Sequence, residues 1–96
     1  MEKKTSPLIV YTASKIEERR SEIEMTQEDL AFKTGLSRSS IINMEHGRQS
    51  ISIERLFSIA EVLEIEPRDL LPNMAWYKDN KGKKLRKVIS FEIVKE

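Results

Sequence analysis

The sequence has 96 residues, with 17 lysines and arginines, 16 aspartates and glutamates, one histidine and no cysteine. A chain of this length forms one small hydrophobic core. Without cysteine it has neither disulfides nor a thiolate zinc site, and one histidine cannot supply a multi-histidine metal site. The longest apolar run, residues 8–11, is too short to cross a membrane or to form a secretory signal. We therefore expect a cytoplasmic protein that uses no metal or other cofactor.

The formal net charge of +1 conceals an uneven distribution of charged side chains. Residues 1–77 carry ten basic and thirteen acidic side chains, whereas residues 78–96 carry seven basic and three acidic ones. Within the first part, residues 33–50 have three basic side chains and one acidic, while residues 54–69 have two basic and five acidic. The net positive charge of residues 33–50 suits contact with an anionic partner, whereas the net negative charge of residues 54–69 would repel such a partner.

Apolar residues at three- and four-residue spacing predict three helices in the first half of the chain. The expected ranges are 7–23, 26–34 and 37–46. Ser6, Thr26 and Ser37 stand at the beginnings of these helices, where a side-chain oxygen caps free backbone N–H groups. Gly35 and Gly47 follow the second and third helices, where glycine readily adopts the positive φ that ends a helix.

A fourth helix is expected over residues 52–63, with Ser52 as its N-cap and the most regular apolar stripe in the chain. The side chains expected to face the core are Ile53, Leu56, Phe57, Ala60 and Leu63. Pro67 then begins a short fifth helix over residues 67–71, because proline suits the first position of a helix.

The pattern changes after Asn73. Residues 88–94 alternate between apolar and polar, which predicts a β-strand, and residues 74–78 are the candidate hairpin partner across a turn at 79–82. A lone strand is unstable in water, so it must pair within the chain, across a dimer or with a partner protein.

The second and third expected helices are joined by a tight turn that contains Gly35 and Leu36, an arrangement known as a helix-turn-helix. The short turn places the third helix on the surface with its N-terminal end foremost. Because an α-helix fits the major groove of B-form DNA, this helix is the part of the chain best suited to probe double-stranded DNA.

The third helix offers side chains that can read base edges. Arginine binds guanine through two hydrogen bonds, and asparagine binds adenine in the same bidentate way. We therefore expect Arg38 and Asn43 to contact bases, with Ser39 as a weaker reader. Two or three such contacts are too few to select one site in a genome, so we expect a homodimer with half-sites about one helical turn apart.

Phosphate contacts are expected on either side of these bases, where they position the protein without reading the sequence. Gln27 stands at the start of the second helix and offers a side-chain amide together with free backbone N–H groups. Ser37 and Ser40 offer hydroxyl groups, and Arg48 follows directly after the third helix.

Taken together, these motifs resemble the lambda-repressor/Cro type of helix-turn-helix domain, the Xre family of bacterial and phage regulators. The resemblance covers residues 16–71, more than half of the chain. The matching residues are Arg20, 25–31, 35–38, Ile41, 44–48, Ser52, Ile53, Leu56, Ala60 and Leu63. The resemblance implies five helices, base reading from the third helix, and repression by a homodimer at an inverted-repeat operator.

The resemblance also implies roles for individual residues. It implies base reading by Arg38, Ser39 and Asn43 and phosphate contacts by Gln27, Ser40 and Arg48. The family often pairs an arginine of the first helix with the glutamate that ends the third, here Arg20 and Glu45. Arg20 also lies on the apolar stripe of its helix, which favours an inward side chain. Two positions depart from the family: Glu24 replaces a common glycine, and Ile51 replaces a frequent proline.

The expected fold class is mainly α, with a five-helix lambda-repressor-like domain over residues 1–72 and a short C-terminal β-strand or hairpin extension over residues 73–96. The expected function is sequence-specific regulation of transcription, and not catalysis, because the sequence contains no nucleophile–base pair, metal cluster or phosphate loop. One alternative is an antitoxin-type module whose residues 73–96 bind a partner protein. A helix-turn-helix that has lost DNA binding is another, against which Arg38 and Asn43 argue.

Overall fold

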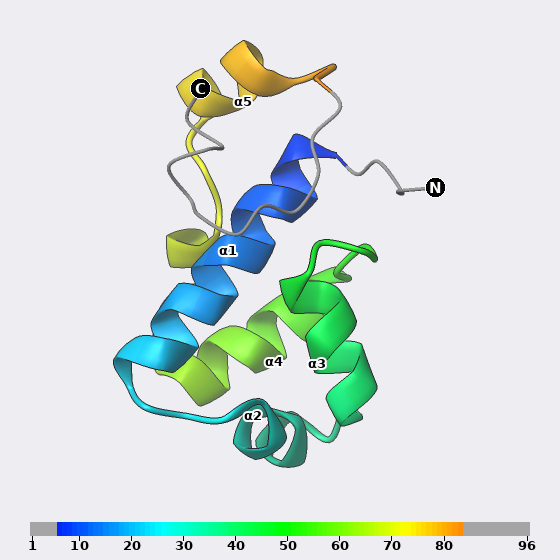
Figure 1. The fold of residues 1–96 in the computed structure, drawn as a ribbon. Helices are drawn as coiled ribbons and strands as arrows, with labels where there is room; N and C mark the ends of the chain where they lie inside the picture. Colours follow the sequence, from blue (N-terminus) through cyan, green and yellow to red (C-terminus); the bar gives the residue numbers. More distant parts are fainter. Residues whose placement is uncertain (1–5, 84–96) are drawn as a thin grey trace.

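A computed structural model describes residues 6–83 and shows a helical fold (Figure 1). Its elements, in chain order, are α1 (Pro7–Glu22), α2 (Gln27–Thr34), α3 (Arg38–Glu45), α4 (Ile53–Leu63), η1 (Pro67–Leu70) and α5 (Met74–Asn80). The mainly α class is therefore confirmed, and the short helix expected over residues 67–71 is the 3-10 helix η1. Between residues 6 and 83 no helix is long and apolar enough to cross a membrane.

Side-chain caps fix where the helices begin. The hydroxyl oxygens of Ser6, Thr26, Ser37 and Ser52 each accept a hydrogen bond from the backbone N–H three residues further on, at 3.0–3.2 Å. These bonds satisfy N–H groups that have no carbonyl partner inside their own helix. The helix starts expected from these four residues are therefore confirmed.

Two turns around α2 require a left-handed backbone. Gly35 ends α2 with a φ of 76°, a conformation that glycine adopts without steric cost. Glu24, in the turn before α2, has a φ of 56°, although a residue with a β-carbon adopts this conformation at a cost of about 1 kcal/mol. Glu24 is the position at which the resembled family commonly has glycine, so the structure gives the physical reason for that preference.

The core lies where α1, α2, α3, α4 and η1 meet. Its largest fully buried apolar side chains are Ile16, Leu30, Ile41, Met44, Ile59, Leu63 and Leu70. Two polar contacts attach the later elements to α1: Thr12 Oγ1 donates to the carbonyl of Leu70 at 2.9 Å, and Arg19 Nε donates to the carbonyl of Leu63 at 3.0 Å. The long helix α1 is therefore the platform against which the shorter elements are fixed.

The expected inward stripe of α4 is wrong at two positions. Ile53 and Phe57 are 73% and 58% exposed, whereas Ile59, which lies outside the expected stripe, is fully buried. Because a helix turns by about 100° per residue, Ile53 and Phe57 lie about a third of a turn away from Ile59 and Leu63. Helix α4 therefore has one wide apolar face, of which the edge formed by Ile53 and Phe57 lies outside the core.

The expected β pairing of residues 74–78 is also wrong, because these residues lie in helix α5. Asn73 Oδ1 accepts the backbone N–H of Trp76 at 2.8 Å, so the residue after Pro72 acts as a helix N-cap. The Trp76 ring meets the ring of Tyr11 in α1 edge to face, with centroids 4.9 Å apart. No strand occurs in the described range 6–83, and the strand expected over residues 88–94 lies outside it.

Candidate nucleic-acid interface

Helices α2 and α3 are consecutive, lie against each other and are joined by residues 35–37 (Figure 1). Gly35 reverses the chain, and the partly buried side chain of Leu36 packs against the core. Ser37 then begins α3 as its N-cap. This arrangement is the helix-turn-helix expected from the sequence, and α3 lies at the outer edge of the molecule.

Helix α3 has one buried and one outward face. Ile41, Met44 and Glu45 are buried. Arg38 and Ser39 are exposed in the first turn, and Asn43, one turn further along, is half-buried. Ser39 and Asn43 are four positions apart and share one side of the helix, while Arg38 is exposed at its N-terminal end. The side chains of α3 that reach the surface here are thus a guanidinium group, a hydroxyl group and an amide.

The side chains expected to contact phosphate differ in how they are engaged. Ser37 Oγ accepts the backbone N–H of Ser40 at 3.0 Å and donates its own proton to Ser40 Oγ at 3.1 Å, so its hydroxyl serves to cap α3. The hydroxyl of Ser40 accepts that bond and keeps its own proton to donate. Arg48 is exposed three residues after the end of α3, where its backbone N–H donates to the carbonyl of Asn43 at 2.9 Å.

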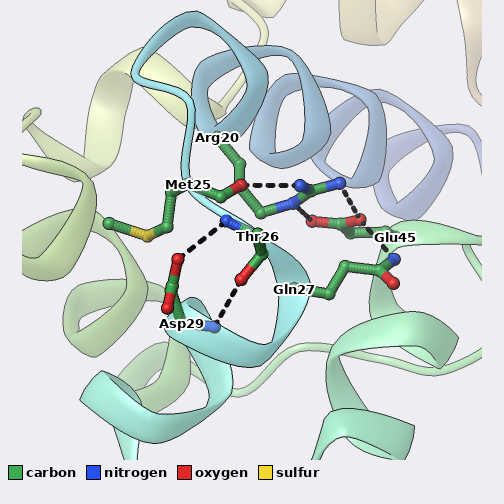
Figure 2. A network of polar contacts seen from close by, with 6 residues as sticks. All are labelled: Arg20, Met25, Thr26, Gln27, Asp29 and Glu45. Atoms are coloured by element: carbon green, nitrogen blue, oxygen red, sulfur yellow. Dashed lines mark hydrogen bonds and ion pairs between the residues drawn. The ribbon is translucent and has the colours of Figure 1, made fainter.

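A polar network joins α1, α2 and α3 around the carboxylate of Glu45 (Figure 2). Arg20 Nε donates to Glu45 Oε2 at 2.7 Å, and Arg20 Nη2 donates to Oε1 at 3.0 Å. Arg20 Nη1 donates to the carbonyl of Met25 at 2.8 Å, which holds the turn between α1 and α2. Gln27 Nε2 donates to Glu45 Oε1 at 3.0 Å. One buried carboxylate therefore accepts three hydrogen bonds from two preceding helices.

The Arg20–Glu45 pair is a buried ion pair rather than a surface contact. The Glu45 side chain is 1% exposed and that of Arg20 is 14% exposed. Hydrogen bonding to Glu45 raises the pKa of Arg20 above its already high ordinary value, so the guanidinium stays charged. A pair at this depth is strongly favourable only while both members are present, because either charge alone would be buried without compensation.

A capping box occupies two of the backbone N–H groups at the N-terminus of α2. Thr26 Oγ accepts the N–H of Asp29, and Asp29 Oδ2 accepts the N–H of Thr26 at 3.1 Å (Figure 2). The backbone hydrogen bond from Thr26 lowers the pKa of Asp29, so this carboxylate is charged near neutral pH. Glu28 adds a second carboxylate to the same turn, and both would repel a phosphate. The capping box uses the N–H groups of Thr26 and Asp29 and not that of Gln27.

The bond between Gln27 and Glu45 is a feature that sequence reasoning missed. The two residues are 18 positions apart and lie in different helices, so no helical or strand periodicity relates them. Only the packing of α2 against α3 brings them together. The resemblance implied the pair of Arg20 with Glu45, but it implied no hydrogen bond from Gln27 to that pair.

We expect Arg20→Met to destabilise the protein by about 3 kcal/mol, because it leaves the Glu45 carboxylate buried without its charged partner. Urea denaturation followed by circular dichroism measures this change. The control is Glu22→Gln, which removes an exposed ion pair with Arg19 at 3.4 Å and should cost about 0.5 kcal/mol or less. Equal losses for the two variants would contradict the structural weight given to the buried pair.

Comparison with known proteins supports the helix-turn-helix interpretation. The chain is 38% identical over 53 residues to control protein C.BamHI of Bacillus amyloliquefaciens, in a match that spans 55% of this chain and 65% of that protein. The chain thus covers slightly less than two thirds of this relative. The restriction-modification controller protein C.AhdI from Aeromonas hydrophila has a similar solved structure, with a TM-score of 0.64 and 35% identity over 66% of this chain and 96% of that one.

The same fold occurs inside a larger protein of a different kind. Hydroxypropylphosphonic acid epoxidase from S. wedmorenis matches with a TM-score of 0.66 and 25% identity, over 71% of this chain but only 36% of its own. A shared fold of this extent does not specify an activity. The model of the helix-turn-helix family (HTH_3) matches residues 16–70, which is more than half of the chain. The chain therefore belongs to the helix-turn-helix family.

Proposed function

We propose that the protein is a sequence-specific, DNA-binding regulator of transcription that acts as a repressor, with α3 in the major groove. The observation that carries this proposal is that α3 of a helix-turn-helix exposes Arg38 at its N-terminal end and presents Ser39 and Asn43 one turn apart on one side. Arginine and asparagine are the side chains that discriminate guanine and adenine most directly in the major groove. The names of C.BamHI and C.AhdI, a control protein and a controller protein, agree with a regulatory role.

The residues around α3 divide into two groups in this proposal. Arg38, Ser39 and Asn43 read base edges, whereas Gln27, Ser40 and Arg48 contact phosphates. Ser37 contributes by capping α3, since its hydroxyl is engaged there. The first group determines which sequence is bound, and the second determines how the protein is placed on the DNA.

We further propose that two copies bind an inverted-repeat operator as a homodimer. Three base-reading side chains discriminate by about 1–3 kcal/mol each, so one copy alone cannot separate an operator from the competing sites of a genome. Two copies double the contacts, and recognition helices about one helical turn apart match two half-sites on the same face of the DNA.

The surface that we assign to this contact is the α4 patch, formed by Ile53 and Phe57. Both side chains are apolar and exposed, and they lie on neighbouring turns of α4. Residues 46–52 connect α3 to α4, and we propose that a contact made here by two copies sets the spacing between their two α3 helices. Exposed apolar side chains that are grouped in this way are typical of subunit interfaces.

Three further expectations stay predictions within this proposal. They are the division of the chain at residues 72 and 73, a cytoplasmic location, where the target DNA is found, and, in the alternative antitoxin-type interpretation alone, a protein partner bound through residues 73–96. We also propose that the chain has no catalytic activity of its own, since the regulatory relatives match its helix-turn-helix region.

The proposed function is tested by selecting duplexes from random oligonucleotides with the purified protein at two salt concentrations. An enriched inverted repeat, with half-sites about one helical turn apart, is the expected result. Binding that shows no sequence preference, and that disappears as the salt concentration rises, would contradict sequence-specific regulation because it reports phosphate attraction alone.

Two arginine substitutions separate base reading from phosphate binding. On the selected duplex we expect Arg38→Ala to cost about 1–3 kcal/mol and to relax the preference for one base pair per half-site. Arg48→Ala should weaken binding to all sequences alike and lower the slope of log K against log salt by about one unit per subunit. Fluorescence anisotropy across a salt series measures both effects. Identical behaviour of the two variants would overturn this division of roles.

Phe57→Glu tests the α4 patch. A charged side chain in an apolar interface should raise the dissociation constant of the dimer about tenfold or more, and sedimentation velocity measures the shift to monomer. The matched control is Phe32→Glu, which changes an 87% exposed phenylalanine of α2 and should leave the oligomeric state unchanged. If Phe57→Glu remains as dimeric as the wild type, the two copies meet elsewhere.

A further inference from the structure

We propose that Glu45 is a positioning residue for DNA binding: its buried carboxylate holds one N–H of the Gln27 amide, so that the other N–H is aimed at a DNA phosphate. The inference rests on the proposed function and adds a residue that does not itself touch the DNA. Its starting point is the 3.0 Å hydrogen bond from Gln27 Nε2 to Glu45 Oε1.

The chemistry of the two groups fixes the orientation of the amide. A carboxylate only accepts hydrogen bonds, so the nitrogen of Gln27 and not its oxygen must face Glu45. The amide nitrogen carries two N–H groups in one plane, about 120° apart, and Glu45 takes one of them. Within residues 6–83 no further acceptor is bonded to this nitrogen, and the side chain of Gln27 is only half-buried. The second N–H is therefore held at a defined angle and is available to an external acceptor.

Electrostatics explains why a carboxylate can do this next to DNA. An unpaired glutamate would repel a phosphate, but the bidentate contact with Arg20 balances the charge of Glu45. The carboxylate can then polarise the Gln27 amide through a charge-assisted hydrogen bond while the net charge of the Arg20–Glu45 pair stays near zero. Arg20 thus makes the position of Glu45 compatible with an anionic ligand.

The placement of Glu45 links the phosphate contact to the recognition helix. Glu45 is the last residue of α3, while Gln27 is the first residue of α2. Two hydrogen bonds, one from Gln27 to the phosphate and one from Gln27 to Glu45, thereby fix the position of the phosphate relative to the helix that carries Arg38 and Asn43. Phosphate contacts fix where a recognition helix lies along the groove, so this link sets the register in which bases are read.

The test replaces single phosphates of the selected duplex by uncharged methylphosphonates and measures affinity for wild type, Gln27→Ala and Glu45→Gln. For the wild type we expect a loss of about tenfold at one phosphate per half-site, the size of a hydrogen bond to a charged group. Gln27→Ala should be insensitive to that replacement. Glu45→Gln should show a clearly smaller loss at the same phosphate, with unchanged losses at all others. Circular dichroism verifies that each variant is folded at the assay temperature.

A second measurement uses the wild type alone, so it does not depend on whether Glu45→Gln folds. The two side-chain amide protons of Gln27 give separate NMR signals. In the free protein we expect one of them to be shifted by the bond to Glu45. Adding the duplex should shift the other proton and leave the first in place. If the Glu45-bonded proton instead moves to the chemical shift of an amide proton without a hydrogen bond, Gln27 leaves Glu45 to reach DNA. That result would overturn the proposal.

The outcomes distinguish this inference from the proposed function. If the wild type selects no duplex, regulation by DNA binding fails and the inference fails with it. If the wild type binds its operator but Glu45→Gln keeps the full loss at the Gln27 phosphate, only the positioning role is wrong. If Glu45→Gln becomes less sensitive to methylphosphonate replacement by the same factor at every phosphate, Glu45 has a purely structural role.

Discussion

A carboxylate buried at the end of α3 is the constraint around which this small fold is arranged. Glu45 is 1% exposed, and a charge at that depth is tolerated only when it is paired and fully hydrogen bonded. Arg20 supplies two hydrogen bonds from α1 and Gln27 supplies one from α2. Satisfying this single group therefore fixes three helices relative to one another at one point.

The shortness of the helices makes such a constraint necessary. Helices α2 and α3 have eight residues each, and isolated helices of this length are unstable in water. Their stability comes from caps, from the apolar core and from contacts to the longer α1. The outward face of α3 is thus built on a rigid platform, although α3 itself is only two turns long.

Much of this architecture is predictable from local sequence. Ser6, Thr26, Ser37 and Ser52 mark helix starts because their oxygens bond N–H groups only three residues away, and Gly35 marks the turn because it adopts a positive φ. All of these effects act over a few residues. The resemblance to a known family added the partnership of Arg20 and Glu45, which no local rule contains.

The errors have equally physical causes. The regular spacing of Ile53 and Phe57 in α4 indicates a helix correctly, but spacing does not tell which edge of a wide apolar face enters the core. Residues 74–78 form too short a segment for helix and strand patterns to differ, and the cap by Asn73 decides in favour of a helix. The bond between Gln27 and Glu45 depends on tertiary packing alone.

A crystal structure of the protein bound to its selected duplex is the measurement that tests this account most directly. The account predicts that α3 lies in the major groove, that Arg38 and Asn43 contact base edges, and that Gln27 bonds a phosphate while it remains bonded to Glu45. A complex in which α3 faces solvent, or in which another surface of the chain contacts the DNA, would contradict it.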